Sequence, residues 1–208
     1  KIKENYICFS EKNLLKNKNL NFERFNSQIK FSTLYKNADA LYQNPPQYDI
    51  YITGSDQVWN PTLGFELEAY FLTFAPQNAK RIAYAPSIAR NDLPPQFKSK
   101  YINWLKQYQH LSIREKSGQQ IIESLLDLKI PVVLDPTFLL SPDEWEKQMS
   151  NINESGKFIL CFTLSNNNLI EYAYQLSQEA QLPLVIISTY NIYKIKGAIT
   201  ILNAGPSE

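Results

Sequence analysis

The stretch Asp49–Pro61, DIYITGSDQVWNP, decides how this chain is expected to fold. Ile50, Tyr51 and Ile52 favour β-structure and Gly54 follows them, which predicts a buried strand that ends in a glycine turn. Hydroxyl, carboxylate, amide and indole groups come directly after it, on Ser55, Asp56, Gln57, Trp59 and Asn60. Because ligands of open α/β sheets bind beyond the carboxyl ends of the strands, this is the first place to expect a site.

The composition is that of a folded protein and argues against several classes of function. The chain has 208 residues, of which 44% are hydrophobic and 13% aromatic, enough to build a core in one large domain or two small ones. A net charge of +1 gives no electrostatic reason to expect nucleic acid or an anionic membrane as a partner. No apolar run approaches the roughly 20 residues of a membrane span.

The few cysteines and the single histidine restrict the chemistry further. Cys8 and Cys161 are far apart and have no second Cys or His at ligand spacing, so we expect neither a metal site nor a disulfide framework. His110 is the only histidine, so any histidine base within this chain must be this residue. It precedes a predicted strand, at the edge opposite to the expected site, which favours a structural role.

Predicted strands and helices alternate after the opening motif, which favours parallel βαβ units. Further strands are expected at 82–85, 111–113 and 131–134, with an amphipathic helix at 97–108 and another helix that Ser117 and Gln120 open as a capping box. The polar stretch 150–156 marks a domain boundary, giving domains at 1–150 and 151–208. In the second we expect strands at 158–164, 184–188 and 199–202 and a helix at 169–181.

Each polar candidate has a functional and a structural interpretation. Asp56 and Gln57 can bind the hydroxyls of a polar substrate, or Ser55 and Asp56 can simply cap the following turn. Arg114, at the end of the third predicted strand, can bind a phosphate or carboxylate with two hydrogen bonds, or can form a surface pair with Glu115 or another neighbouring acid.

Two more strand ends carry polar groups. Ser87 and Arg90 follow the second predicted strand and offer a hydroxyl and a guanidinium. Asp135, in Asp135-Pro136-Thr137, suits a structural role as a cap where the fourth strand ends. These observations predict a polar site at the strand ends, but they do not identify a reaction.

An ordered set of motifs resembles the polysaccharide pyruvyl transferase family. The motifs stand in the family's order over roughly residues 21–208, and they are GSDQVWN at 54–60, YAPS at 84–87, SIRE at 112–115 and LDPT followed by LL at 134–140. The resemblance implies two Rossmann-like domains similar to the glycosyltransferase B architecture, with the active site in the cleft between them.

The resemblance also implies a reaction and its participants. The enolpyruvyl group of phosphoenolpyruvate, the donor substrate, would be transferred to sugar hydroxyls of a bacterial surface polysaccharide or its lipid-linked precursor, which forms a pyruvate ketal. It implies no metal, no further cofactor and no nucleic acid, and a cytoplasmic enzyme for which peripheral association with the inner face of the membrane stays open. By motif, the substrate-binding residues would be Arg114, Ser55, Asp56, Gln57, Ser87 and Arg90.

This sequence also departs from the family's pattern at both ends. The family's first βα unit, with its Asn-Tyr-Gly-type turn, does not precede Lys1, and the segment with the expected catalytic histidine would lie beyond Glu208. We therefore expect a central fragment of two incomplete domains, inactive by itself, in which His110 does not inherit the catalytic role. Two alternatives stay open: a nucleotide-sugar glycosyltransferase of similar fold, and a non-catalytic module that binds glycans or proteins.

Overall fold

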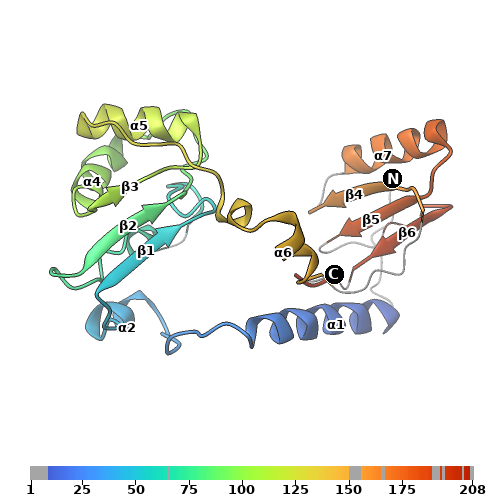
Figure 1. The fold of residues 1–208 in the computed structure, drawn as a ribbon, viewed down its shortest axis with the longest axis horizontal. Helices are drawn as coiled ribbons and strands as arrows, with labels where there is room; N and C mark the ends of the chain where they lie inside the picture. The colour runs from blue at the N-terminus through green and yellow to red at the C-terminus, as the bar shows by residue number, and fades with distance from the viewer. Residues whose placement is uncertain are drawn as a thin grey trace. The chain divides into compact units, whose positions relative to one another are not determined.

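The structure, a computed structural model, describes residues 9–64, 66–149, 156–164, 167–188, 193, 195–202 and 204–206. These residues are mixed α/β and contain two parallel sheets of three strands each (Figure 1). The chain divides into two compact units, Ser32–Pro142 and a second unit formed by Lys1–Phe31 with Asp143–Glu208. The α/β class predicted from the sequence is confirmed.

The sheet of the first unit has the strand order β1-β2-β3. β1 (Ile50–Gly54) pairs in parallel with β2 (Lys80–Tyr84) along its whole length, and β2 pairs in parallel with β3 (His110–Leu111). Parallel pairing places the exits of the strands at one edge of the sheet, which is where the polar motifs of the sequence follow.

The third and fourth strands are shorter than the sequence predicted. β3 stops at Leu111, and the expected strand at 131–134 is reduced to a single bridge between Ile113 and Val132. Two backbone bonds attach this segment, from Ile113 N–H to the Pro131 carbonyl (3.1 Å) and from Val133 N–H to the Ile113 carbonyl (2.9 Å). Pro131 has no N–H to donate, so the ladder does not extend through it.

Two helices cover one face of this sheet, α4 (Pro95–Leu105) and α5 (Lys116–Leu126) (Figure 1). The core packs between them and the sheet, and its largest fully buried side chains include Trp59, Tyr101 and Phe71. The short helices α2 (Ala38–Gln43) and α3 (Leu67–Tyr70) complete the unit.

The other face of β1 is open in the part of the chain that the structure describes. Tyr51 and Thr53 are buried, whereas Ile50 and Ile52 are 51% and 63% exposed. The prediction of a buried strand is therefore wrong for Ile50 and Ile52. A strand's side chains alternate between two faces, and among the described residues the helices cover only one of them.

The start of α5 also differs from the predicted capping box at Ser117 and Gln120. The helix begins at Lys116, its N-cap is Glu115, and no side chain makes a capping hydrogen bond. The Glu115 carboxylate instead accepts hydrogen bonds from the N–H groups of Ile88 and Ala89, at 2.9 and 3.2 Å. Glu115 thus attaches the loop after β2 to the helix.

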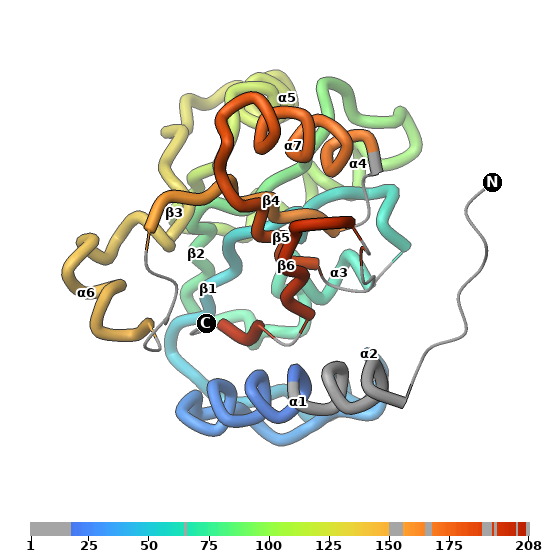
Figure 2. The backbone as a smooth tube through the Cα atoms, turned by 90° about the vertical axis from the view of Figure 1, so that its right-hand side faces the viewer, coloured from blue at the N-terminus to red at the C-terminus, as the bar shows by residue number. Residues whose placement is uncertain are grey.

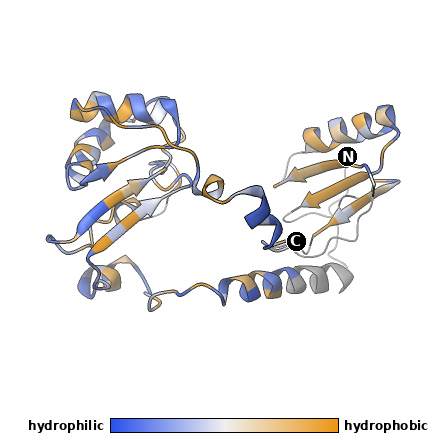
Figure 3. Ribbon diagram, in the orientation of Figure 1, coloured by the Kyte–Doolittle hydropathy of each residue, from blue (hydrophilic) through white to orange (hydrophobic). Residues whose placement is uncertain are grey.

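The sheet of the second unit is formed by β4 (Ile159–Thr163), β5 (Leu184–Ser188) and β6 (Ala198–Ile201), in that order and all parallel. The helix α7 (Asn167–Ala180) lies along one face of this sheet (Figures 1 and 2). β4 and β5 are predominantly hydrophobic, as Figure 3 shows. These three strands and α7 agree with the predicted elements to within two residues at each end. The other helices of the second unit are α1 (Phe9–Asn26) and α6 (Pro142–Glu146).

Candidate active site

The polar motif after β1 begins with backbone that few residues adopt. A Cβ atom on Gly54 would lie 2.0 Å from the Tyr84 carbonyl oxygen, so this position requires glycine. Ser55 and Asp56 then have φ values of 24° and 60°, in the left-handed region that costs a residue with a side chain of order 1 kcal/mol or more. Such conformations persist where surrounding contacts fix them, and they concentrate at functional sites.

The contacts that fix this loop come from the neighbouring strand exit and from the core. Ser87 N–H donates to the Asp56 carbonyl (2.8 Å), and Trp59 N–H donates to the Ser87 carbonyl (3.1 Å). The Trp59 side chain is fully buried and stacks on Phe71 with 4.6 Å between ring centroids. The Tyr101 hydroxyl donates to the Trp59 carbonyl at 2.5 Å. The backbone that carries the polar side chains of the motif is therefore held in place by the core and by the neighbouring loop.

Four side chains meet at the strand exits, and we call them the strand-end cluster: Ser55, Asp56, Arg114 and Asp135. Arg114 Nη1 donates to Asp135 Oδ2 at 3.0 Å and to Ser55 Oγ at 3.4 Å. Ser55 Oγ in turn donates to the same Asp135 oxygen. Arg114 Nη2 lies 3.9 Å from Asp56 Oδ1, too far for a hydrogen bond.

The cluster combines one guanidinium with two carboxylates in different surroundings. The hydrogen bond from Ser55, then those from Thr137 and from Arg114, hold the pKa of the Asp135 carboxyl well below its usual range. Its side chain is 24% exposed and that of Arg114 is 30% exposed, whereas that of Asp56 is 88% exposed. Arg114 Nη2 therefore lies beside a carboxylate that is largely exposed to solvent.

The comparison with protein families agrees with the motifs that form this cluster. A sequence model of the family described as Polysaccharide pyruvyl transferase matches residues 1–202 of the 208-residue chain. The chain belongs to this family. The resemblance seen in the sequence is confirmed, and the match begins before residue 21, where we expected it to begin. Comparisons with curated proteins and with solved structures gave no match.

In this member of the polysaccharide pyruvyl transferase family, the structure brings together three of the predicted site residues, Ser55, Asp56 and Arg114. Asp56 Oδ1 also accepts from the N–H of the next residue, Gln57, at 2.8 Å. Arg114 does pair with acids, but not with Glu115.

The other predicted residues make contacts within their own loops. Gln57 Oε1 accepts from Asn60 Nδ2 at 3.0 Å, and Ser87 is buried and contributes the backbone bonds already described. Arg90 forms an ion pair with Asp92 at 3.1 Å. In the part of the chain that the structure describes, Arg90 makes no hydrogen bond or ion pair with the strand-end cluster.

From the sequence, Asp135 was predicted to have only a structural role. Its capping role is confirmed, because Oδ1 accepts from Thr137 N–H at 3.0 Å and from Thr137 Oγ1 at 2.9 Å. Its pairing with Arg114 was missed. Arg114 and Asp135 each directly follow a predicted strand, which was the signal in the sequence, but the adjacency of the two strand exits depends on how the segment at Val132 packs against Ile113.

His110 is exposed and begins β3, at the end of the strand opposite to the strand-end cluster, as predicted. Among the described residues, no group of three or more His, Cys, Asp or Glu side chains is placed to hold a metal ion. Within the same residues, no helix has the length and apolar character needed to cross a membrane.

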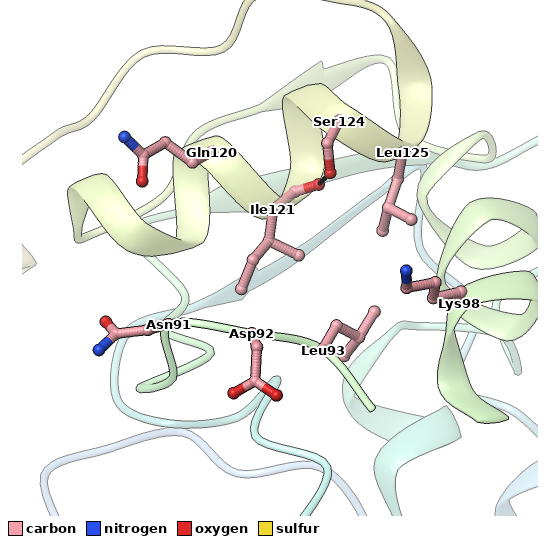
Figure 4. Close-up of a pocket in the computed structure, with 8 residues that line it drawn as sticks. All are labelled: Asn91, Asp92, Leu93, Lys98, Gln120, Ile121, Ser124 and Leu125. Carbon is pink, nitrogen blue, oxygen red and sulfur yellow. Dashed lines mark hydrogen bonds between the residues drawn. The ribbon is translucent and has the colours of Figure 1, made fainter. Parts of the chain in front are cut away.

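A separate hollow of about 270 Å³ lies in the helical layer of this family member, and Figure 4 shows it. Its lining residues come from the loop after β2, from α4 and from α5: Asn91, Asp92, Leu93, Lys98, Gln120, Ile121, Ser124 and Leu125. The strand-end cluster does not line it. The Lys98 ammonium points toward this hollow in Figure 4. Lys98 is therefore a cation of the first unit that lies outside the strand-end cluster.

Proposed function

We propose that this protein transfers the enolpyruvyl group of phosphoenolpyruvate to two hydroxyls of a sugar in a surface polysaccharide or its lipid-linked precursor. Each hydroxyl oxygen forms a bond to C2 of the donor. A proton is added to C3, and the bond between C2 and the phosphate oxygen breaks. The products are a pyruvate ketal and inorganic phosphate, and the two hydroxyl protons balance the equation.

The family match carries this proposal, since it covers residues 1–202 and names pyruvyl transfer to a polysaccharide. The donor follows from chemistry, because phosphoenolpyruvate holds the pyruvyl unit in an activated form with a phosphate leaving group. We also propose that the two units correspond to the Rossmann-like domains of a glycosyltransferase B-like architecture, with which two parallel sheets are compatible.

Arg114 is the residue that we propose binds the anionic donor. A guanidinium binds carboxylate and phosphate oxygens through charge-assisted hydrogen bonds, and the partial exposure of the Arg114 side chain supports this assignment. Asp56 and Gln57 are proposed for the acceptor side. The exposed Asp56 carboxylate can accept hydrogen bonds from sugar hydroxyls next to the donor.

The experiment measures phosphate release by the intact protein from phosphoenolpyruvate over a broad panel of acceptor glycans. We expect release with at least one acceptor, and a loss of about 100-fold or more in kcat/KM for Arg114→Met. Lys98→Met is the matched control, because it removes a cation of the same unit that lies outside the cluster.

Two results would contradict the proposal. Absence of phosphate release over the whole panel, together with protection of the protein by a nucleotide sugar, would replace it with glycosyl transfer. A loss of activity in Lys98→Met but not in Arg114→Met would remove the donor site from the strand-end cluster. Circular dichroism of both variants confirms that the compared proteins are folded.

A further inference from the structure

We propose that Asp135 is a positioning residue that orients the Arg114 guanidinium toward the donor. The inference rests on the proposed function, because it assumes that Arg114 binds phosphoenolpyruvate. It goes further in assigning a role to a residue outside the substrate-binding set and in naming the parameter that this residue controls.

The first observation is that the Asp135 carboxylate is itself fixed. Oδ1 accepts hydrogen bonds from Thr137 N–H and Thr137 Oγ1, at 3.0 and 2.9 Å. Oδ2 accepts from Ser55 Oγ and from Arg114 Nη1. Four donors thus hold two oxygens, and one of those donors is backbone, so the carboxylate cannot rotate without breaking bonds.

The second observation concerns what this fixed carboxylate does to Arg114. An arginine side chain loses rotamer entropy when it is held in one geometry. Asp135 holds Nη1 before any ligand arrives, and Arg114 N–H is bonded to the Pro86 carbonyl at 3.0 Å. Because the guanidinium is planar, fixing Nη1 also directs Nη2 away from Asp135, to the side where Asp56 lies.

The third observation argues against a purely structural salt bridge. The segment that carries Asp135 is already attached to the sheet by the two backbone bonds of Ile113 with Pro131 and Val133. Arg114 and Asp135 are both partly exposed, and partly exposed ion pairs contribute little to stability. The depressed pKa of the Asp135 carboxyl also keeps it ionised, so it does not serve as the proton donor to C3.

The test compares Asp135→Asn with Glu123→Gln in the intact protein. Glu123 pairs with Lys129 at 2.8 Å at the far end of α5, so its variant removes an ion pair of the same unit away from the cluster. For Asp135→Asn we expect the KM for phosphoenolpyruvate to rise about 10-fold to 100-fold, because a misoriented binding group is costly to affinity and alignment. We expect the KM for the acceptor and the melting temperature to match those of Glu123→Gln.

Thr137→Val supplies a second variant, because it removes one hydrogen bond to Asp135 and keeps the carboxylate and its backbone donor. We expect a smaller rise in the same KM, and this variant carries the test where Asp135→Asn does not fold.

The outcomes separate this inference from the proposed function. If the wild-type protein neither binds nor consumes phosphoenolpyruvate, the proposed function fails, and the inference fails with it. If the wild-type protein turns over and both Asp135→Asn and Thr137→Val keep its KM for phosphoenolpyruvate, only the positioning role is overturned. If kcat falls and both KM values rise in proportion to the loss of melting temperature, Asp135 is likewise shown to be structural.

Discussion

Replacing Trp59 by phenylalanine tests whether the loop after β1 is held by the core. Trp59 is fully buried, stacks on Phe71 and donates from Nε1 to the Tyr70 carbonyl at 3.3 Å. Phenylalanine keeps an aromatic ring in this place but removes the N–H and leaves part of the indole volume empty. The substitution therefore weakens the attachment without changing any polar side chain of the strand-end cluster.

The expected magnitude follows from two contributions. The lost hydrogen bond is worth about 1 kcal/mol. The smaller ring leaves a void whose cost we place at about 1–2 kcal/mol, below the ~3–5 kcal/mol of a truncation to alanine. The total of about 2–3 kcal/mol is a large part of the ~5–15 kcal/mol that stabilises a typical protein. Trp145, which is 39% exposed, is the control, and its replacement by phenylalanine should cost under about 1 kcal/mol.

Urea unfolding followed by circular dichroism measures the total loss in the free energy of unfolding. Hydrogen exchange with mass spectrometry shows which part of the chain is destabilised. Peptides that cover 54–60 and 84–90 should exchange faster in Trp59→Phe, because backbone bonds of Trp59 and Asp56 with Ser87 join them. Peptides of β5, in the other unit, should keep their wild-type rates. Equal unfolding midpoints for the variants at Trp59 and Trp145, or unchanged exchange at 54–60, would refute the anchoring role.

Two further predictions concern the same edge of the sheet. Gly54→Ala should destabilise the protein by about 3 kcal/mol or more, since the new Cβ would lie 2.0 Å from the Tyr84 carbonyl oxygen. Gly64→Asn, in open space at φ +71°, should cost about 1 kcal/mol or less in the same thermal melt, because asparagine tolerates left-handed backbone better than most residues. Equal losses in the two variants would contradict the steric argument. The hydrogen bond from Ser55, and those from the other partners of Asp135, lower the pKa of its carboxyl in the folded protein. The stability that the ionised carboxylate contributes to the fold is therefore complete above about pH 4 and is lost as the pH falls further. The difference in urea midpoint between wild type and Asp135→Asn, small at about pH 6 because the ion pair is partly exposed, should therefore shrink further by about pH 3, and a constant difference would show that the carboxylate charge does not stabilise the fold.

Strands and helices that are determined by their own residues were predicted correctly. The run Leu184–Ser188 is apolar, rich in β-branched residues and bounded by polar stretches, and it forms β5 with those same limits. Burial was predicted less well, because the exposure of Ile50 and Ile52 depends on which faces of the sheet are covered. The helix start at Lys116 was missed because the Glu115 side chain bonds a loop from a distant part of the sequence.

In the candidate site, too, the sequence predicted which residues lie at the strand exits but not which of them form pairs. Ser55, Asp56 and Arg114 were predicted to gather because parallel strands place their exits at one edge. The partner of Arg114 was not predicted, since it depends on how the segment after Val132 lies against Ile113. Arg90 was predicted as a substrate ligand on the same argument, but in the structure its guanidinium pairs with Asp92, two residues away.

The backbone bonds that join the loops after β1 and β2 have a consequence for how this site can diversify. Main-chain groups survive any substitution except one to proline, so the loops can keep their shape while their side chains are exchanged. Gln57 has no left-handed backbone and can vary widely, whereas Asp56, at φ 60°, lies in a conformation that favours aspartate, asparagine or glycine. A library aimed at new acceptor sugars should therefore randomise position 57 fully and confine position 56 to those three residues.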